Sequence, residues 1–229
     1  MPESTLLLGI DTCGPSGSVA LGRWDGQAVE ILGQIELEGR SYSSTLVAAV
    51  SELLARGGVT LREVGAIVAV SGPGSFTGVR VGLSAVKGLA EAARIPVAAV
   101  SRLDVLAAKA EVSSAALDAH RHEVFLRLGL PGEPARELLA GAHELAAIDS
   151  PPPLIALCDE AAALLLASAW PQAELIRAAA PTAVNALILC APRVAAGEFV
   201  DLALLDGHYL RRSDAEIFGE AATVEAEWA

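Results

Sequence analysis

AVSGPGSFTGVRVGLSAVKGLAEAA, residues 69–93, runs from an apolar segment through a loop rich in glycine and proline into small and aliphatic residues at helical spacing. The apolar residues 64–71 predict a buried strand, and the residues from about 78 to 93 predict a helix. A strand-to-helix junction of this kind can bind a dinucleotide, cradle a phosphate or present a nucleophilic serine. The spacing inside the loop discriminates among these functions.

The loop matches none of the three functional templates. A dinucleotide-binding turn needs a third glycine where Thr77 stands, and Gly78 comes one position late. A P-loop ends in Gly-Lys-Ser or Gly-Lys-Thr, which this sequence lacks, and a nucleophile elbow needs glycine two residues before and after Ser75. We therefore expect a packing loop whose serine or threonine caps the helix. Its residues are Gly72, Pro73, Gly74, Ser75, Thr77 and Gly78.

The segments around this loop predict the order β-β-β-α-β-α-β for the first half of the chain. Residues 5–10 and 16–23 read as a hairpin, residues 29–37 as a third strand, and residues 95–101 as the strand after the second helix. The first helix, from about residue 43 to 56, is amphipathic. Its apolar stripe consists of Leu46, Val47, Val50, Leu53 and Leu54.

The second half begins like the first. Residues 114–130 repeat the plan of residues 6–23, with an apolar strand, an aspartate, a short polar turn and a second strand, so Asp118 corresponds to Asp11. Chance similarity is the alternative, because a strand that ends in Asp before a turn is common. Residues 131–153 read as a proline-rich surface excursion. A strand at 154–158 and two alanine-rich helices, at about 160–168 and 182–196, follow.

Composition restricts the function. The 229 residues carry a net charge of -12 and only 4% aromatic residues, which argues against direct capture of a nucleic-acid backbone. The three cysteines, Cys13, Cys158 and Cys190, form no C-x-x-C pair, so neither a zinc site nor a disulfide framework is indicated. Without a basic leader or an apolar stretch of about 20 residues, we expect a soluble cytoplasmic protein with no membrane span.

Five segments together resemble the TsaB family, also called YeaZ. They are LLLGIDTCGPSGSVALG (6–22), SGPGSFTGVRVGLSAVKGLA (71–90), IPVAAVSRLDVLA (95–107), ALDAHRHEVF (116–125) and YLRRSDAE (209–216). The resemblance implies an α/β fold of the duplicated actin/Hsp70-like (ASKHA, RNase H-like) type with two subdomains, the second reduced. Residues 1–102 and a returning segment of about 200–229 would form the first subdomain, and residues 103–199 the second.

The resemblance also implies a role without catalysis. The family is a scaffold and activator for threonylcarbamoyl transfer to adenosine 37 of tRNA (t6A): it binds and activates the transferase TsaD and recruits the ATPase TsaE. A homodimer through the same face is the competing assembly. No cofactor of its own, ATP or ADP only at the assembled complex, and no direct tRNA binding by the isolated chain are expected. The metal site of TsaD needs two histidines at i and i+4, and the four histidines here contain no such pair.

The resemblance and the residue patterns single out a few candidate sites. Asp11 and Thr12 match the family's first turn, which corresponds to a phosphate-binding loop in the wider superfamily, so with Arg211 they are candidates for a weak nucleotide contact. Arg211 and Arg212 could instead meet an acidic partner. Asp118, His120 and His122 alternate like metal ligands, although a solvated hairpin turn is the expected reading, and the family usually has Arg and Gly at positions 120 and 122.

The sequence is compatible with two functions. In the favoured reading the two helices of the first half form a partner interface, in which Gly82 lets a partner helix approach closely. Its residues are Leu46, Val50, Leu53, Leu54, Val79, Gly82, Val86 and Leu89. The alternative is a stand-alone hydrolase or small-molecule kinase that uses Asp11 as a base and Ser75 as a phosphate or acyl contact.

Overall fold

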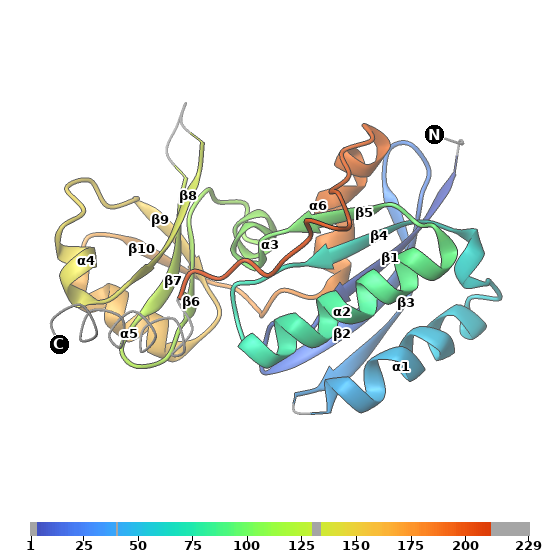
Figure 1. The fold of residues 1–229 in the computed structure, drawn as a ribbon. Helices are drawn as coiled ribbons and strands as arrows, with labels where there is room; N and C mark the ends of the chain where they lie inside the picture. Colours follow the sequence, from blue (N-terminus) through green and yellow to red (C-terminus); the bar gives the residue numbers. More distant parts are fainter. Residues whose placement is uncertain (1–3, 40, 130–133, 212–229) are drawn as a thin grey trace, which may run out of the picture.

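Two five-stranded sheets, each covered by helices on both faces, make up the molecule (Figure 1). This computed structural model describes residues 4–39, 41–129 and 134–211. The first sheet has the order β3-β2-β1-β4-β5 and the second the order β10-β9-β6-β7-β8. The first consists of β1 (Thr5–Asp11), β2 (Ser16–Trp24), β3 (Val29–Glu38), β4 (Val64–Val70) and β5 (Val97–Val100). The second consists of β6 (Ala115–Asp118), β7 (Val124–Leu128), β8 (Arg136–Ala140), β9 (Leu154–Leu157) and β10 (Glu174–Arg177).

The two sheets are built on one plan. In each, the first three strands form an antiparallel meander, and the fourth and fifth add in parallel beside the first. Asp11 ends the first strand of one sheet and Asp118 ends the first strand of the other. The predicted duplication and the α/β fold with two related subdomains are therefore confirmed.

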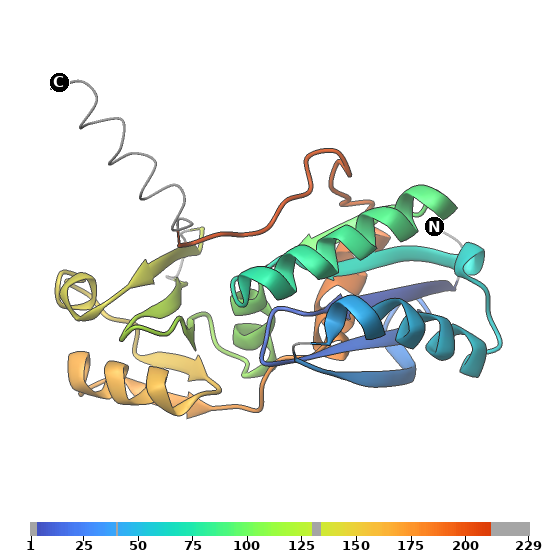
Figure 2. The ribbon, with the colours of Figure 1, turned by 60° about the horizontal axis from the view of Figure 1, so that its bottom comes forward.

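The helices of the first subdomain each turn an apolar side to the first sheet. Helices α1 (Tyr42–Arg56) and α2 (Phe76–Ala93) lie side by side on one face of the first sheet, and α6 (Ala183–Ala195) covers the other face (Figures 1 and 2). Burial of the first sheet on both faces explains why β1 and β4 are almost wholly apolar. The central strands and all three helices share one core.

The second subdomain is smaller. Helix α3 (Arg102–Lys109) covers one face of its sheet, while α5 (Glu160–Ala169) and the short α4 (Ala142–Ala146) lie on the other. These layers enclose two separate apolar clusters, one centred on Leu126 and Leu157 and the other on Leu103 and Leu117. A single turn of 3-10 helix, η1 (Leu61–Glu63), leads into β4.

The predicted domain boundary was wrong for α6. The sequence predicts residues 103–199 in the second subdomain, but α6 packs on all five strands of the first sheet. Leu187 lies against Gly9 and Gly22, where added β-carbons would come within 3.3 Å of it. The chain therefore returns to the first subdomain at about residue 182 rather than 200.

The prediction that residues 131–153 form an irregular surface segment was incomplete. Residues 131–153 contain β8 and α4, and β10 and α3 were not anticipated. β8 carries Arg136 and Glu137 next to apolar residues and lacks a clear alternation, which hides a short strand from sequence reasoning. Within the described part of the chain, no helix is both long and apolar enough to cross a bilayer.

Candidate functional site at the junction of the two sheets

The turn after β1 lies at the junction of the two subdomains. The Asp11 carboxylate accepts a hydrogen bond from the backbone N–H of Cys13 at 2.8 Å and one from Nε of Arg102 at 3.4 Å. Asp11 is 1% exposed and Arg102 is 5% exposed. The carboxylate thus forms an ion pair shielded from solvent, in which each charge compensates the desolvation of the other.

Arg102 was not singled out from the sequence, yet it closes this turn. It is the first residue of α3, its backbone N–H donates to the Gly72 carbonyl at 2.6 Å, and its guanidinium fills the space beside Gly14. Tyr42 closes the other side, donating its hydroxyl to the Gly14 carbonyl at 2.9 Å. Burial, reinforced by the charge of Asp11, raises the pKa of Tyr42 to about 12.

The other side chains of this turn, Thr12 and Cys13, make contacts that stabilise the fold. The Thr12 hydroxyl donates to the Gly78 carbonyl at 2.7 Å and is buried beneath α2. Cys13 donates its thiol to the Val70 carbonyl at 3.3 Å, and burial, together with the Asp11 charge, raises the pKa of its thiol well above the ordinary value. In this arrangement the side chains of the turn bind the rest of the fold instead of facing a ligand.

The glycine-rich loop between β4 and α2 packs directly on this turn. Gly72 adopts a φ of +115°, and Ser75 caps α2 by accepting from the Gly78 N–H at 3.3 Å, which settles the predicted choice between Ser75 and Thr77. β-carbons added at Gly74, Gly78 and Gly82 would lie 2.1, 2.1 and 2.2 Å from Cys13 O, Thr12 O and Thr12 Oγ1. Gly74 and Gly78 thus admit the chain's own backbone, as expected of a packing loop, and Gly82 admits the Thr12 side chain.

Most of the predicted interface residues are buried inside the first subdomain and do not face a partner. The apolar stripes of α1 and α2 face their own sheet, because that sheet needs both helices to cover it. Within this chain the structure buries Leu46, Val50, Leu53, Leu54, Val79, Gly82 and Val86, and Leu89 is half-buried against the same core. The close neighbour of Gly82 is Thr12 and not a partner helix. The prediction that these side chains meet a partner was wrong for the buried seven.

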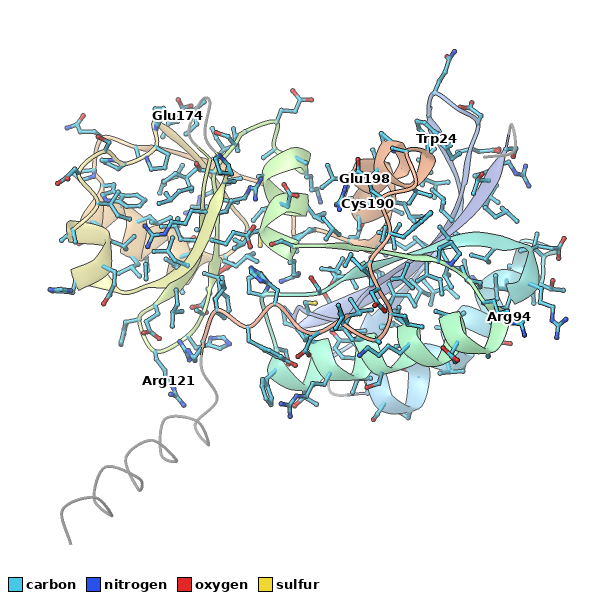
Figure 3. The ribbon with its side chains drawn as sticks, turned by 45° about the horizontal axis from the view of Figure 1, so that its top comes forward. Trp24, Arg94, Arg121, Glu174, Cys190 and Glu198 are labelled. Carbon is cyan, nitrogen blue, oxygen red and sulfur yellow. The ribbon has the colours of Figure 1, made fainter. Side chains whose placement is uncertain are left out.

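The hairpin turn after β6 is a polar turn. Asp118 accepts the His120 N–H at 2.8 Å and lies 2.9 Å from Nδ1 of the same histidine. His120, Arg121 and His122 all have positive φ angles, and Arg121 lies at the outer end of the turn (Figure 3). Across the described residues, no group of three His, Cys, Asp or Glu side chains is placed to hold a metal. Arg211 contacts Glu123 at this turn, whereas Arg212 lies outside the described residues.

A second polar centre, missed by sequence reasoning, joins the subdomains at Glu137 on β8. Its carboxylate accepts the Ser101 hydroxyl at 2.7 Å, lies 2.8 Å from Nε2 of His208, and pairs with Arg127 at 3.1 Å. Burial opposes ionisation of Glu137, but the hydrogen bonds from His208 and Ser101 hold its pKa below the ordinary value. In the sequence, only an acidic residue directly before the apolar residues 138–140 of β8 marked this position.

The chain is similar in sequence to proteins of one family. A family model described as "TsaD: tRNA N6-adenosine threonylcarbamoyltransferase" matches residues 34–130. The TsaB protein of Haemophilus influenzae, a "tRNA threonylcarbamoyladenosine biosynthesis protein", is 37% identical over 129 residues, which cover 54% of this chain and 53% of that protein. The Escherichia coli TsaB is 35% identical over 52% of each chain. The alignments thus span about half the length of these curated relatives.

Solved structures match over a larger share. A Pseudomonas aeruginosa protein described as similar to "peptidase YEAZ" is 30% identical, with a TM-score of 0.71 over 90% of this chain and 100% of that one. The structure described as "YeaZ from Pseudomonas aeruginosa" is 26% identical, with a TM-score of 0.69 over the same shares. The structural similarity therefore extends over 90% of this chain, whereas the alignments with the curated relatives cover 52–54% of it.

Proposed function

The chain belongs to the TsaB (YeaZ) family, and we propose that it acts in the cytoplasm as the non-catalytic scaffold and activator of threonylcarbamoyl transfer to adenosine 37 of tRNA. In this proposal it binds and activates TsaD and recruits the ATPase TsaE, while TsaD performs the transfer. Nucleotide binds only at the assembled complex. A homodimer through the same face is the competing state.

The burial of Asp11 is the observation that carries the non-catalytic role. A general base must reach the proton that it removes, but Asp11 is 1% exposed and its Oδ2 accepts from Arg102. Ser75, the other group of the hydrolase or kinase alternative, caps α2. Both side chains thus have structural partners, which supports an activating subunit over an independent enzyme.

The outer faces of α1 and α2 are the proposed site for TsaD. Small or apolar residues are exposed on both helices, beside charged ones: Val47, Ala48 and Ser51 on α1, with Glu52 and Arg56, and Ser84 and Gly88 on α2, with Arg80 and Glu91. Glycine inside a helix is about 1 kcal/mol less favourable than alanine. Among the described residues, a β-carbon added at Gly88 would meet open space within 4 Å, so packing against the described fold does not explain this glycine. A partner helix that approaches at Gly88 would.

Co-purification with the TsaD and TsaE of the same organism, with and without ATP, tests the assembly. We expect a complex with TsaD and, with nucleotide, with TsaE, together with stimulation of t6A formation on a tRNA transcript. Hydrolysis of ATP or peptides by the purified chain alone that disappears in Asp11→Ala would favour the stand-alone enzyme instead.

Single substitutions test the interface. Gly88→Arg should abolish co-elution with TsaD because a long charged side chain would be trapped between helices, while the melting temperature stays near that of the unmodified protein. Gly88→Ala is the conservative control at the same position. Leu164→Arg on α5, where the leucine is 66% exposed, is the control for adding an arginine elsewhere. Wild-type affinity of Gly88→Arg for TsaD would place the interface on another surface.

A further inference from the structure

The C-terminal strap, residues 200–211, crosses from the first subdomain to the second (Figures 1 and 2). It begins beside β5, where the Val200 N–H donates to the Val97 carbonyl at 2.9 Å. Leu205 is buried in the first core, but Leu204 is 79% exposed. The strap is therefore held at a few points along its length and is otherwise open to solvent.

The middle of the strap is fixed at the N-terminal end of α2. The His208 N–H donates to the Ser71 carbonyl at 2.7 Å. The Tyr209 ring lies 5.2 Å from that of Phe76, and its hydroxyl accepts from Nε of Arg80 at 3.3 Å. Arg80 also lies over the Phe76 ring at 3.7 Å. These contacts join the strap to the first subdomain.

Three side chains of the strap reach the other subdomain, two of them polar, while Leu210 packs against the apolar cluster around Leu103 and Leu117. His208 lies 2.8 Å from the Glu137 carboxylate on β8, and Arg211 pairs with Glu123, which precedes β7. The Glu137 side chain is 8% exposed and also pairs with Arg127, so its charge is held in place by its own subdomain. A partly buried, charge-assisted hydrogen bond to such an acceptor is stronger than an exposed surface pair.

The strap lies opposite another connection between the subdomains. The chain also crosses at residues 178–182, where Nζ of Lys109 donates to the Ala180 carbonyl at 2.9 Å. Figure 2 shows that connection and the strap on opposite edges of the molecule. Two connections on opposite edges restrain rotation of one body against another more strongly than one, because a single connection leaves a hinge.

We propose that the strap sets the angle between the two subdomains through His208 and Arg211, and that release of these two side chains lets the subdomains move as separate bodies. This inference concerns contacts within the chain and does not depend on the proposed function. The elements that would move together are the N-terminal end of α2 and the strap on one side, and β8 with the β6–β7 turn on the other.

Spin-label distance measurements test the proposal. Labels are placed at Ser51→Cys on α1 and Ser168→Cys on α5, both exposed positions, in a Cys158→Ser background, since Cys13 and Cys190 are buried. In the protein with the native strap, the two labels should give one narrow distance distribution. His208→Ala combined with Arg211→Ala should broaden it at least twofold, with the far-ultraviolet circular dichroism unchanged. Leu204→Ala, on the same strap but without a crossing contact, should leave it narrow.

His208→Gln provides a rescue, because its amide can still donate to Glu137 while the imidazole is absent. Combined with native Arg211, it should restore the narrow distribution that His208→Ala alone partly loses. An unchanged distribution in the double variant, or equal broadening in Leu204→Ala, would overturn the proposal. The first result would show that the 178–182 connection, α3 and the apolar contact of Leu210 set the angle. The second would show that any substitution in the strap broadens the distribution.

Discussion

Gly82→Ala should destabilise this protein although alanine is the better helix former. The added β-carbon would lie 2.2 Å from Oγ1 of Thr12, which is buried and donates to the Gly78 carbonyl. Removing this clash requires movement of the β1–β2 turn, which carries Thr12, or of α2. Overpacking of this kind lowers the free energy of unfolding by about 1–3 kcal/mol. In contrast, Gly88→Ala, with open space around it, should raise that free energy by about 0.5–1 kcal/mol.

A double-mutant cycle with Thr12→Ala isolates the contact. Thr12→Ala removes a buried hydrogen bond and should cost about 1 kcal/mol. It also removes Oγ1, which leaves the Thr12 β-carbon 3.4 Å from the added methyl group, an ordinary van der Waals distance. The double variant should therefore be no less stable than Thr12→Ala alone. The expected coupling between the two sites is about 2 kcal/mol, within the range for residues in contact.

Urea denaturation of the four proteins, followed by circular dichroism and tryptophan fluorescence, measures the cycle. The same slope of the free energy against urea in all four would show that only stability has changed. Additivity of the two substitutions within about 0.5 kcal/mol would refute the packing argument. Equal effects of Gly82→Ala and Gly88→Ala on the free energy of unfolding would also refute it, because the two positions would then have the same surroundings.

Three further predictions follow from the charges and the buried groups. Because the pKa of Glu137 is lowered from 4.5 in the fold, the stability that its charge contributes is complete above pH 4.5 and is lost as the pH falls through the folded pKa. The stability difference of about 1–3 kcal/mol between the wild type and Glu137→Gln at pH 7 should therefore shrink as the pH is lowered below 4.5, and a difference independent of pH in denaturation curves would contradict this. A thiol reagent at pH 8 should react slowly with Cys158, whose pKa burial raises to about 11, and not with Cys13 or Cys190 until urea unfolds the chain, so rapid labelling of more than one native thiol by mass spectrometry would disagree. With a net charge of -12, the isolated chain should bind tRNA negligibly in filter-binding assays at physiological salt, and micromolar binding with a steep salt dependence would disprove it.

Much of the first subdomain could be predicted from the sequence because its elements are long and periodic. The stripe on α1 and the capped start of α2 follow from apolar spacing and from Ser75. What periodicity cannot tell is what an apolar stripe packs against. Leu46 and Val79 pack in the core of the first subdomain. The outward faces of the two helices instead carry Val47, which is 60% exposed, and Gly88.

The second subdomain and the polar centres were harder to predict. β8 and β10 are short strands that carry charged residues, so they lack the alternation that identifies longer strands. The partners of Asp11 and Glu137 are distant in sequence: Arg102 is 91 residues from Asp11, and His208 is 71 residues from Glu137. No local pattern predicts such pairs, since they exist only when the two sheets are assembled.

The return of α6 to the first sheet has a consequence for synthesis on the ribosome. Chains emerge from the N-terminus, and domains generally fold as units once complete. The second subdomain is continuous from α3 to β10, so its sheet can close as soon as residue 177 is available. The first sheet, whose strands are made earlier, keeps one apolar face uncovered until Leu187 and Cys190 arrive on α6 (Figure 3). The half that is translated first is thus completed last, and its open face is where a nascent chain of this protein would need protection from aggregation.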